Sequence, residues 1–143
     1  MWFMNQAADR ILPKIGTAVW IRHQGKILLG LRSKTSGNNT WGPPGGHLEM
    51  NETLVECAIR ETREEAGIEL ANVKFLTYAE NIFKEAGTHY VTFHFTADWA
   101  SGDLTPDPNE FHNLEWFDWD NLPKPLFRPA QIFFDAGLNP VTF

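Results

Sequence analysis

Cysteine is nearly absent from this chain of 143 residues, since Cys57 is the only one. A lone thiol forms no intramolecular disulfide, so a small secreted scaffold held by bridges is excluded and a reducing, cytoplasmic location is expected. No apolar run approaches the roughly 18 residues of a membrane span. The N-terminal residues MWFMNQAADRILPK include Asp9 and hold no apolar run of signal-peptide length. The sequence therefore predicts neither export nor membrane insertion.

Basic residues are also in short supply, with 12 Lys and Arg against 18 Asp and Glu and a net charge of -6. Such a balance repels phosphate backbones, which argues against a nucleic-acid partner bound through bulk charge. Internal repeats and Gly/Ser/Pro linkers are lacking as well. With 43% hydrophobic residues, the chain is predicted to form one globular domain over residues 1–143.

The order of the predicted elements indicates an α+β fold. Residues 15–32 contain two β-prone stretches around Gln24-Gly25, which is typical of a hairpin. A polar loop (33–39) and the Gly- and Pro-rich turn WGPPGG come next. Strands are then expected over 69–78, 89–99 and 114–117, with a loop over 103–109 and a helix over 129–136. This order predicts a mixed β-sheet packed between α-helices.

The most informative helix is predicted over residues 51–66, with Asn51 as its N-cap and Gly67 ending it. Spacings of four residues favour a surface ladder of Glu56, Arg60 and Glu64. Helical spacing leaves Glu61 and Glu65 next to other acids, in the last turns where the helix dipole disfavours negative charge. Either this is a solvated acidic face or the carboxylates bind a divalent cation such as Mg²⁺ or Mn²⁺. The GPPGG turn, whose Gly and Pro residues can bring a backbone carbonyl close to the same metal, favours the metal.

These residues resemble the signature of the Nudix hydrolase family: Gly, five residues, Glu, seven residues, then R-E-U-x-E-E-x-G-U, where U is aliphatic. The chain has Gly46, Glu52 and the run 60–68, RETREEAGI. Thr62 stands at an aliphatic position, which affects helix packing rather than a ligand. KILLGLR before the signature and the segment ending in EWF after it also fit the Nudix layout.

The resemblance implies a set of metal ligands and their supports. Glu61, Glu64 and Glu65 would bind Mg²⁺ or Mn²⁺ together with the backbone carbonyl of Gly46. Arg60 would orient Glu61, and Glu52 would pair with Arg60. A further carboxylate from a later loop is expected; Glu110 is the candidate, with Asp107 and Glu115 as rivals.

The implied reaction cleaves a nucleoside diphosphate linked to another group, by in-line attack of a metal-activated water. Either Glu64 or Glu61 would accept the proton of that water. Arg32 and His47 are candidates to bind phosphate; the alternatives are an edge side chain for Arg32 and core packing for His47. His94 and Cys57 are expected to be structural.

The chain lacks several sequence motifs that define Nudix subfamilies: the downstream proline of ADP-ribose pyrophosphatases, the coenzyme A motif and the NADH-type SQPWPF segment. WGPPGGHLE and EWFDWDNLPKPLF instead look like the branch that converts nucleoside triphosphates, including oxidised purines, to monophosphate and pyrophosphate. Leu126, Phe127 and Arg128 would then contact the base, although Phe127 is equally suited to anchoring the last helix. Hydrolysis of nucleotide sugars or dinucleoside polyphosphates is the rival activity, and a non-catalytic nucleotide sensor is a further alternative.

Aromatic residues are abundant, with six Trp, two Tyr and eleven Phe. Trp116, Phe117 and Trp119 crowd together, and an exposed part of the aromatic set would line a base pocket or a subunit interface. Homodimers are common in the branch that the chain resembles, so a homodimer is expected.

Overall fold

A computed structural model describes residues 11–143. The segment 1–10, for which no export signal is predicted, lies outside the described residues. The strands are β1 (Lys14–His23), β2 (Lys26–Arg32), β3 (Trp41–Gly42), β4 (Gly45–His47), β5 (Glu69–Phe83), β6 (Thr88–Ser101) and β7 (Phe111–Phe117), and the helices are α2 (Leu54–Ala66) and α3 (Arg128–Asp135). Neither of these helices is long and apolar enough to cross a membrane.

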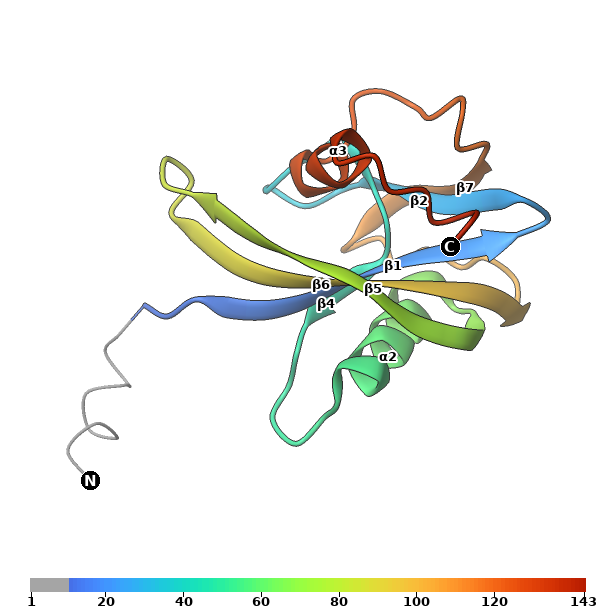
Figure 1. Ribbon diagram of the computed structural model, residues 1–143, viewed down its shortest axis with the longest axis horizontal. Coiled ribbons are helices and arrows are strands. Elements are labelled where there is room, and N and C mark those ends of the chain that lie inside the picture. The colour runs from blue at the N-terminus through green and yellow to red at the C-terminus, as the bar shows by residue number, and fades with distance from the viewer. Residues whose placement is uncertain (1–10) are drawn as a thin grey trace.

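The strands of the described residues join in one mixed sheet with α2 on one face and α3 on the other (Figure 1). The sheet order is β3-β2-β1-β6-β5, while β4 pairs with β1 and β7 pairs with β2. β1 runs parallel to β6 and antiparallel to β2 and β4. The predicted mixed sheet between helices, an α+β fold, is confirmed.

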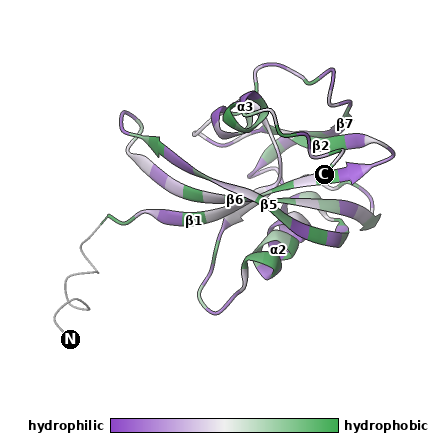
Figure 2. Cartoon of the chain, viewed as in Figure 1, coloured by the Kyte–Doolittle hydropathy of each residue, from purple (hydrophilic) through white to green (hydrophobic). Residues whose placement is uncertain are grey.

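Two hydrophobic clusters hold the layers together. Val19, Ile21 and Phe95 pack with Ala58 and Ala66 of α2, whereas Trp20 and Leu29 pack with Ala130 and Phe133 of α3. Side chains alternate between the two faces of a strand, so β1 contributes to both clusters. Figure 2 shows the resulting bands of hydrophobic and hydrophilic residues along the strands.

Helix α2 begins later than predicted. Thr53, not Asn51, is the N-cap: its hydroxyl accepts the backbone N–H of Glu56, and the Glu56 carboxylate accepts the backbone N–H of Thr53. Asn51 instead has a positive φ of 68°, a conformation that Asn tolerates better than most residues. The prediction of Asn51 as the cap was wrong because this reciprocal capping box satisfies two backbone groups at once. Gly67 ends the helix in the left-handed region, as predicted.

Several other elements differ in length from the predictions. β5 and β6 reach Phe83 and Ser101, beyond the predicted ends, because each pairs with the other along an extended hairpin. β7 starts at Phe111, since β2 pairs with it as far as Arg32. The WGPPGG segment forms the short strands β3 and β4 around its prolines. Helix α3 ends at Asp135 and Ala136 is its C-cap.

Candidate active site

Arg60, on the middle of α2, joins the acidic side chains of this helix. Its Nε and Nη2 atoms donate to the two carboxylate oxygens of Glu52 at 2.8 Å each. Nη1 donates to Glu61 at 2.8 Å and to Glu64 at 3.2 Å, and Nη2 also donates to the backbone carbonyl of His47 at 3.0 Å. One planar guanidinium therefore fixes the helix against the Gly-rich strand β4.

These contacts change the expected surroundings of two residues. Helical spacing left Glu61 among like charges, but the adjacent Arg60 reaches along the helix and pairs with it. Glu56 takes no part in the expected ladder, because its carboxylate caps the helix at Thr53. The Arg60 pairing lowers the pKa of Glu52 to about 2. Burial raises the pKa of Glu61, an effect that the Arg60 hydrogen bond opposes.

Glu65 is almost completely buried, with 4% of its surface exposed. Its carboxylate accepts the backbone N–H of Gly45 at 2.9 Å. Burial raises the pKa of Glu65, the Gly45 bond lowers it, and the nearby carboxylates of Glu110 and Glu61 raise it again. A solvated acidic face therefore does not describe Glu65. Glu64, in contrast, has 57% of its side chain exposed.

Gly46 lies directly against the Glu61 carboxylate. A Cβ atom built on Gly46 would lie 2.3 Å from Cδ of Glu61, so no larger residue fits without displacing the carboxylate. Cys57 is fully buried beneath the same strand, and its thiol lies 3.5 Å from the His47 carbonyl. The predicted core position of Cys57 is confirmed.

Among the three loop acids considered from the sequence, Glu110 is the one close to the cluster. It forms an ion pair with Lys34 at 3.0 Å and its charge acts on Glu65, Glu61 and Arg32. The Asp107 carboxylate instead accepts the backbone N–H of Asn109 within its own loop. Glu115 lies within β7 opposite Leu29, whereas Glu110 comes directly before this strand. Lys34 was missed in the sequence, because a single Lys in a polar loop carries no pattern.

The predicted base-binding residues lie where α3 begins, but they point to different neighbours. The Arg32 guanidinium lies 3.7 Å from the centre of the Phe127 ring, and it donates to the Ser36 carbonyl. Arg128 lies 4.3 Å from the centre of the Phe83 ring. Leu126 packs in the cluster under α3. Burial lowers the pKa of Arg32, while the charges of Glu110 and Glu65 raise it.

His47 lies at the end of β4 and is exposed, so it is not a core histidine. Its Nε2 atom is 3.0 Å from the Tyr90 hydroxyl, and the two rings stack with centroids 5.3 Å apart. Although its surface is exposed, the groups packed around the ring partly desolvate it and lower the pKa of His47, and the positive charges of Lys14 and Lys34 lower it further. Tyr90 and Lys34 thus join Arg32 and His47 as polar groups around the glutamates. His94 is buried, accepts the Trp20 indole N–H and is structural, as expected.

Within residues 11–143, no three His, Cys, Asp or Glu side chains lie ready to coordinate a metal ion. Glu61 is bonded to Arg60 and Glu65 to Gly45, so their oxygens face these donors. The chemistry of the donors nevertheless fits a hard divalent cation, because Glu61, Glu65 and Glu110 are carboxylates near enough to affect one another's pKa at a partly buried site.

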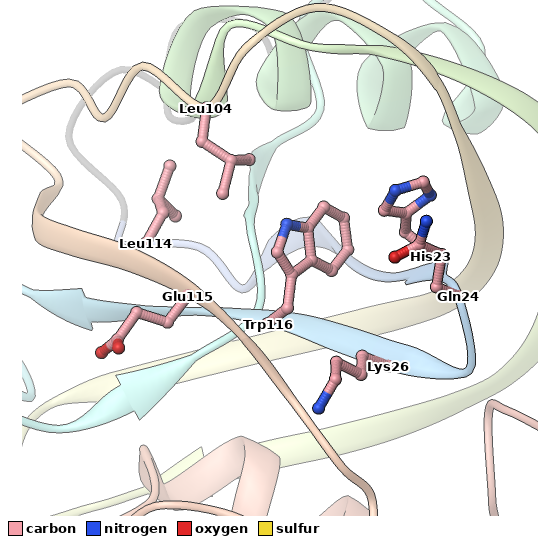
Figure 3. A pocket seen from close by; sticks show the side chains of 7 residues that line it. All are labelled: His23, Gln24, Lys26, Leu104, Leu114, Glu115 and Trp116. Carbon is pink, nitrogen blue, oxygen red and sulfur yellow. The ribbon is translucent and has the colours of Figure 1, made fainter.

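A cavity of about 470 Å³ lies elsewhere, at the opposite end of β2 from Arg32 (Figure 3). Trp116, Leu104 and Lys26 are among its lining residues, and His23 lies between Trp116 and Trp99 at ring distances of 5.3 and 4.5 Å. The crowded aromatic residues on β7 and after it therefore do not face the glutamates. Trp119 packs edge-on against Trp20 in the core.

Comparison with known proteins identifies the family to which this chain is similar. A family model described as the NUDIX domain matches residues 12–136. The crystal structure of a MutT Nudix hydrolase from Burkholderia pseudomallei is similar, with a TM-score of 0.82 and 31% sequence identity over 87% of this chain and 98% of that one. The chain belongs to the Nudix family of hydrolases.

Curated relatives are longer. The NAD-capped RNA hydrolase NudC of Vibrio atlanticus is 37% identical over 80% of this chain and 40% of that protein. NudC of Pectobacterium atrosepticum is 32% identical over 84% of this chain and 45% of that protein. The chain thus spans less than half the length of these relatives. The substrate in the names of these relatives contains RNA, which conflicts in part with the prediction of no nucleic-acid partner. For this chain the absence of a nucleic-acid partner remains a prediction.

Proposed function

We propose that this chain is a divalent-metal-dependent pyrophosphohydrolase that converts a nucleoside or deoxynucleoside triphosphate, including oxidised purine forms, to the monophosphate and pyrophosphate. The observation that carries the proposal is the placement of Glu61 against Gly46 and of the buried Glu65 on the backbone N–H of Gly45, with Glu110 near enough to raise the pKa of Glu65. Acidic side chains packed this closely repel each other unless a cation is present. The net charge of -6 is compatible with a polyanionic substrate because part of the acidity would bind metal.

In this proposal Glu61, Glu64, Glu65 and Glu110 hold Mg²⁺ or Mn²⁺ with the Gly46 carbonyl. The cation would supply neutralisation of phosphate charge and a lowered pKa for water. Arg60 positions Glu61, and Glu52 positions Arg60 through two hydrogen bonds. Glu64 or Glu61 accepts the proton of the attacking water. Arg32, Lys34 and His47 lie around this cluster and bind phosphate oxygens.

A second substrate class is favoured by the similarity to the NudC proteins, which are named as hydrolases of NAD-capped RNA. Both substrates contain a pyrophosphate linkage, so the same cluster of glutamates serves either reaction. The missing SQPWPF segment only narrows the list of substrates, and the WGPPGGHLE and EWFDWDNLPKPLF segments favour triphosphates. The reaction products distinguish the two substrate classes, because a triphosphate yields pyrophosphate whereas NAD yields two nucleoside monophosphates.

The experiment is a panel of nucleoside triphosphates, including oxidised and methylated purines, with NAD, a nucleotide sugar and a dinucleoside polyphosphate, each with Mg²⁺. We expect pyrophosphate from triphosphates and at least about 100-fold lower turnover in Glu65→Gln. The exposed Glu80→Gln is the matched control and should keep full activity. Undiminished turnover in Glu65→Gln would refute the metal assignment, and binding without turnover in the wild type would favour a nucleotide sensor.

The chain is also proposed to form a homodimer. Large apolar side chains are exposed on β1 and β5, where Ile15, Phe75, Tyr78 and Ile82 each have at least 44% of their surface accessible. Such a patch is typical of an interface. Light scattering at micromolar concentration should give twice the chain mass, and Tyr78→Lys should give the monomer. A wild-type monomer at that concentration would rule this assembly out.

A further inference from the structure

Asn81 is a buried polar side chain that the proposed reaction leaves without a role. It lies on β5, an edge strand of the sheet, yet only 3% of its surface is exposed. The Thr92 hydroxyl donates to its Oδ1 atom at 2.8 Å, which fixes the orientation of the amide. Among the described residues, Nδ2 of Asn81 donates to no other group. Within residues 11–143, the fully buried side-chain atoms without a partner are the hydroxyls of Thr62 and Thr96. Nδ2 of Asn81 is not one of them, so it stays accessible and can donate to a ligand.

The place of Asn81 in the sheet connects it to the candidate active site. Asn81 is paired with Tyr90, whose hydroxyl contacts His47. Thr92 is paired with Gly16, which is paired in turn with His47. Paired residues point to the same face, so Asn81, Thr92 and His47 share the α3 face. Thr92 and His47 are two strand spacings apart, or about 10 Å, on the scale of one nucleotide.

This part of the α3 face is not fully covered. Thr92 and Ala18 lie on the two central strands, where neighbours flank them on both sides, and both stay partly exposed. The start of α3 lies over its border, because Arg128 packs on Phe83, two residues after Asn81. Arg128 and Phe83 therefore lie beside the Asn81–Thr92 pair on this face of the sheet.

We propose that Asn81, oriented by Thr92, selects the base of the substrate by donating from Nδ2 to a ring carbonyl. The site then takes 6-oxopurines, guanine or hypoxanthine, in preference to adenine. O6 of guanine accepts a hydrogen bond, whereas the amino group at the same position of adenine is a donor and would face the Asn81 donor. This inference deepens the proposed function and rests on a nucleotide occupying the site.

Equilibrium binding of inosine and adenosine monophosphate, measured by titration calorimetry with Mg²⁺, tests the inference without needing turnover. These two ligands differ at the purine six position. We expect the wild type to bind the inosine nucleotide about tenfold more tightly or better, and Asn81→Asp, which presents only acceptors, to lower that ratio at least about tenfold. Thr92→Val keeps the shape and strand preference while freeing the amide, so it should lower the ratio in part.

Asn121→Asp, an exposed position in the loop after β7, adds the same charge and should leave the ratio unchanged. Equal binding of the two nucleotides by the wild type, or an unchanged ratio in both Asn81→Asp and Thr92→Val, would overturn the inference. Pyrophosphate release from inosine and adenosine triphosphates is recorded separately. Its complete absence with normal monophosphate selectivity would refute the proposed reaction and leave base selection by Asn81 standing.

Discussion

Thr62 illustrates how a single side chain limits the stability of helix α2. It occupies an aliphatic position of the Nudix signature, it is fully buried, and its hydroxyl has no hydrogen-bond partner among residues 11–143. Replacing it with the isosteric Val removes an unpaired buried polar group. We expect Thr62→Val to raise the free energy of unfolding by about 1 kcal/mol in urea titrations. Thr35→Val, in an exposed loop, should change it little; an equal gain there would contradict this explanation.

Gly46 is a residue whose replacement should affect chemistry more than stability. In Gly46→Ala the new methyl group would overlap the Glu61 carboxylate, which must turn away. In the proposed reaction Glu61 is a metal ligand, and displacing a group of the reacting site by about 1 Å can reduce a rate about 100-fold. We therefore expect a loss of that order in kcat while the circular dichroism spectrum stays unchanged. Activity close to that of the wild type would show that Glu61 does not need this position.

At the level of elements, the capping box decides where α2 begins. Thr53→Ala removes the hydroxyl that accepts the Glu56 N–H, and such a change at an N-cap costs about 1 kcal/mol. We expect that loss in the free energy of unfolding, measured by thermal or urea denaturation. A variant as stable as the wild type would mean that the helix start is held by Arg60 and its partners instead.

Most elements were predictable because their signals are local. The hairpin at Gln24-Gly25, the stop at Gly67 and the alternation along β6 follow from a few neighbouring residues. The lengths of β5 and β7 were not predictable, since they depend on pairing with distant strands. The start of α2 was missed because Asn51 and Thr53 are both good caps, and only the bond to Glu56 distinguishes them.

The residues of the candidate site that lie within the Nudix signature were predictable from the sequence. Those that reach the site only through tertiary contacts were not. Glu52, Arg60 and Glu61 were placed together on the signature, and they are bonded in the structure. Lys34 and Asn81 were not predicted, because they come from a loop and a strand without a motif. The role of Tyr90 was not predicted either, because its contact with His47 depends on strand pairing. The burial of Glu65 was not predictable from the sequence either, because its neighbours on the helix are polar and only the tertiary structure shows that it is covered.

For the whole molecule, His94 should make stability depend on pH. Burial lowers its pKa from 6.5 to about 4 in the folded chain. Between these values the unfolded chain binds a proton that the folded chain does not, so acidification through this window lowers the free energy of unfolding. From pH 7 to 4.5 this residue should remove about 2 kcal/mol. Urea titrations of the wild type and His94→Gln at both pH values measure the difference.

Glutamine keeps an acceptor for the Trp20 indole N–H but does not titrate in this range. Other groups also titrate between pH 7 and 4.5, and their contribution is common to both proteins. The expected result is a smaller acid-induced loss in the variant. Identical losses in both proteins would mean that His94 is protonated in the folded state at an ordinary pKa.

The parallel pairing of β1 with β6 has a consequence for how the protein is made. Arg22 and Asp98, which face each other across these strands, are 76 residues apart in the chain. During synthesis the β1–β2 hairpin therefore leaves the ribosome long before the strand that covers its open edge. Such distant pairing slows folding and leaves an unpaired edge exposed to other chains. A product that terminates before β6 would thus carry an uncovered central strand rather than a trimmed tail.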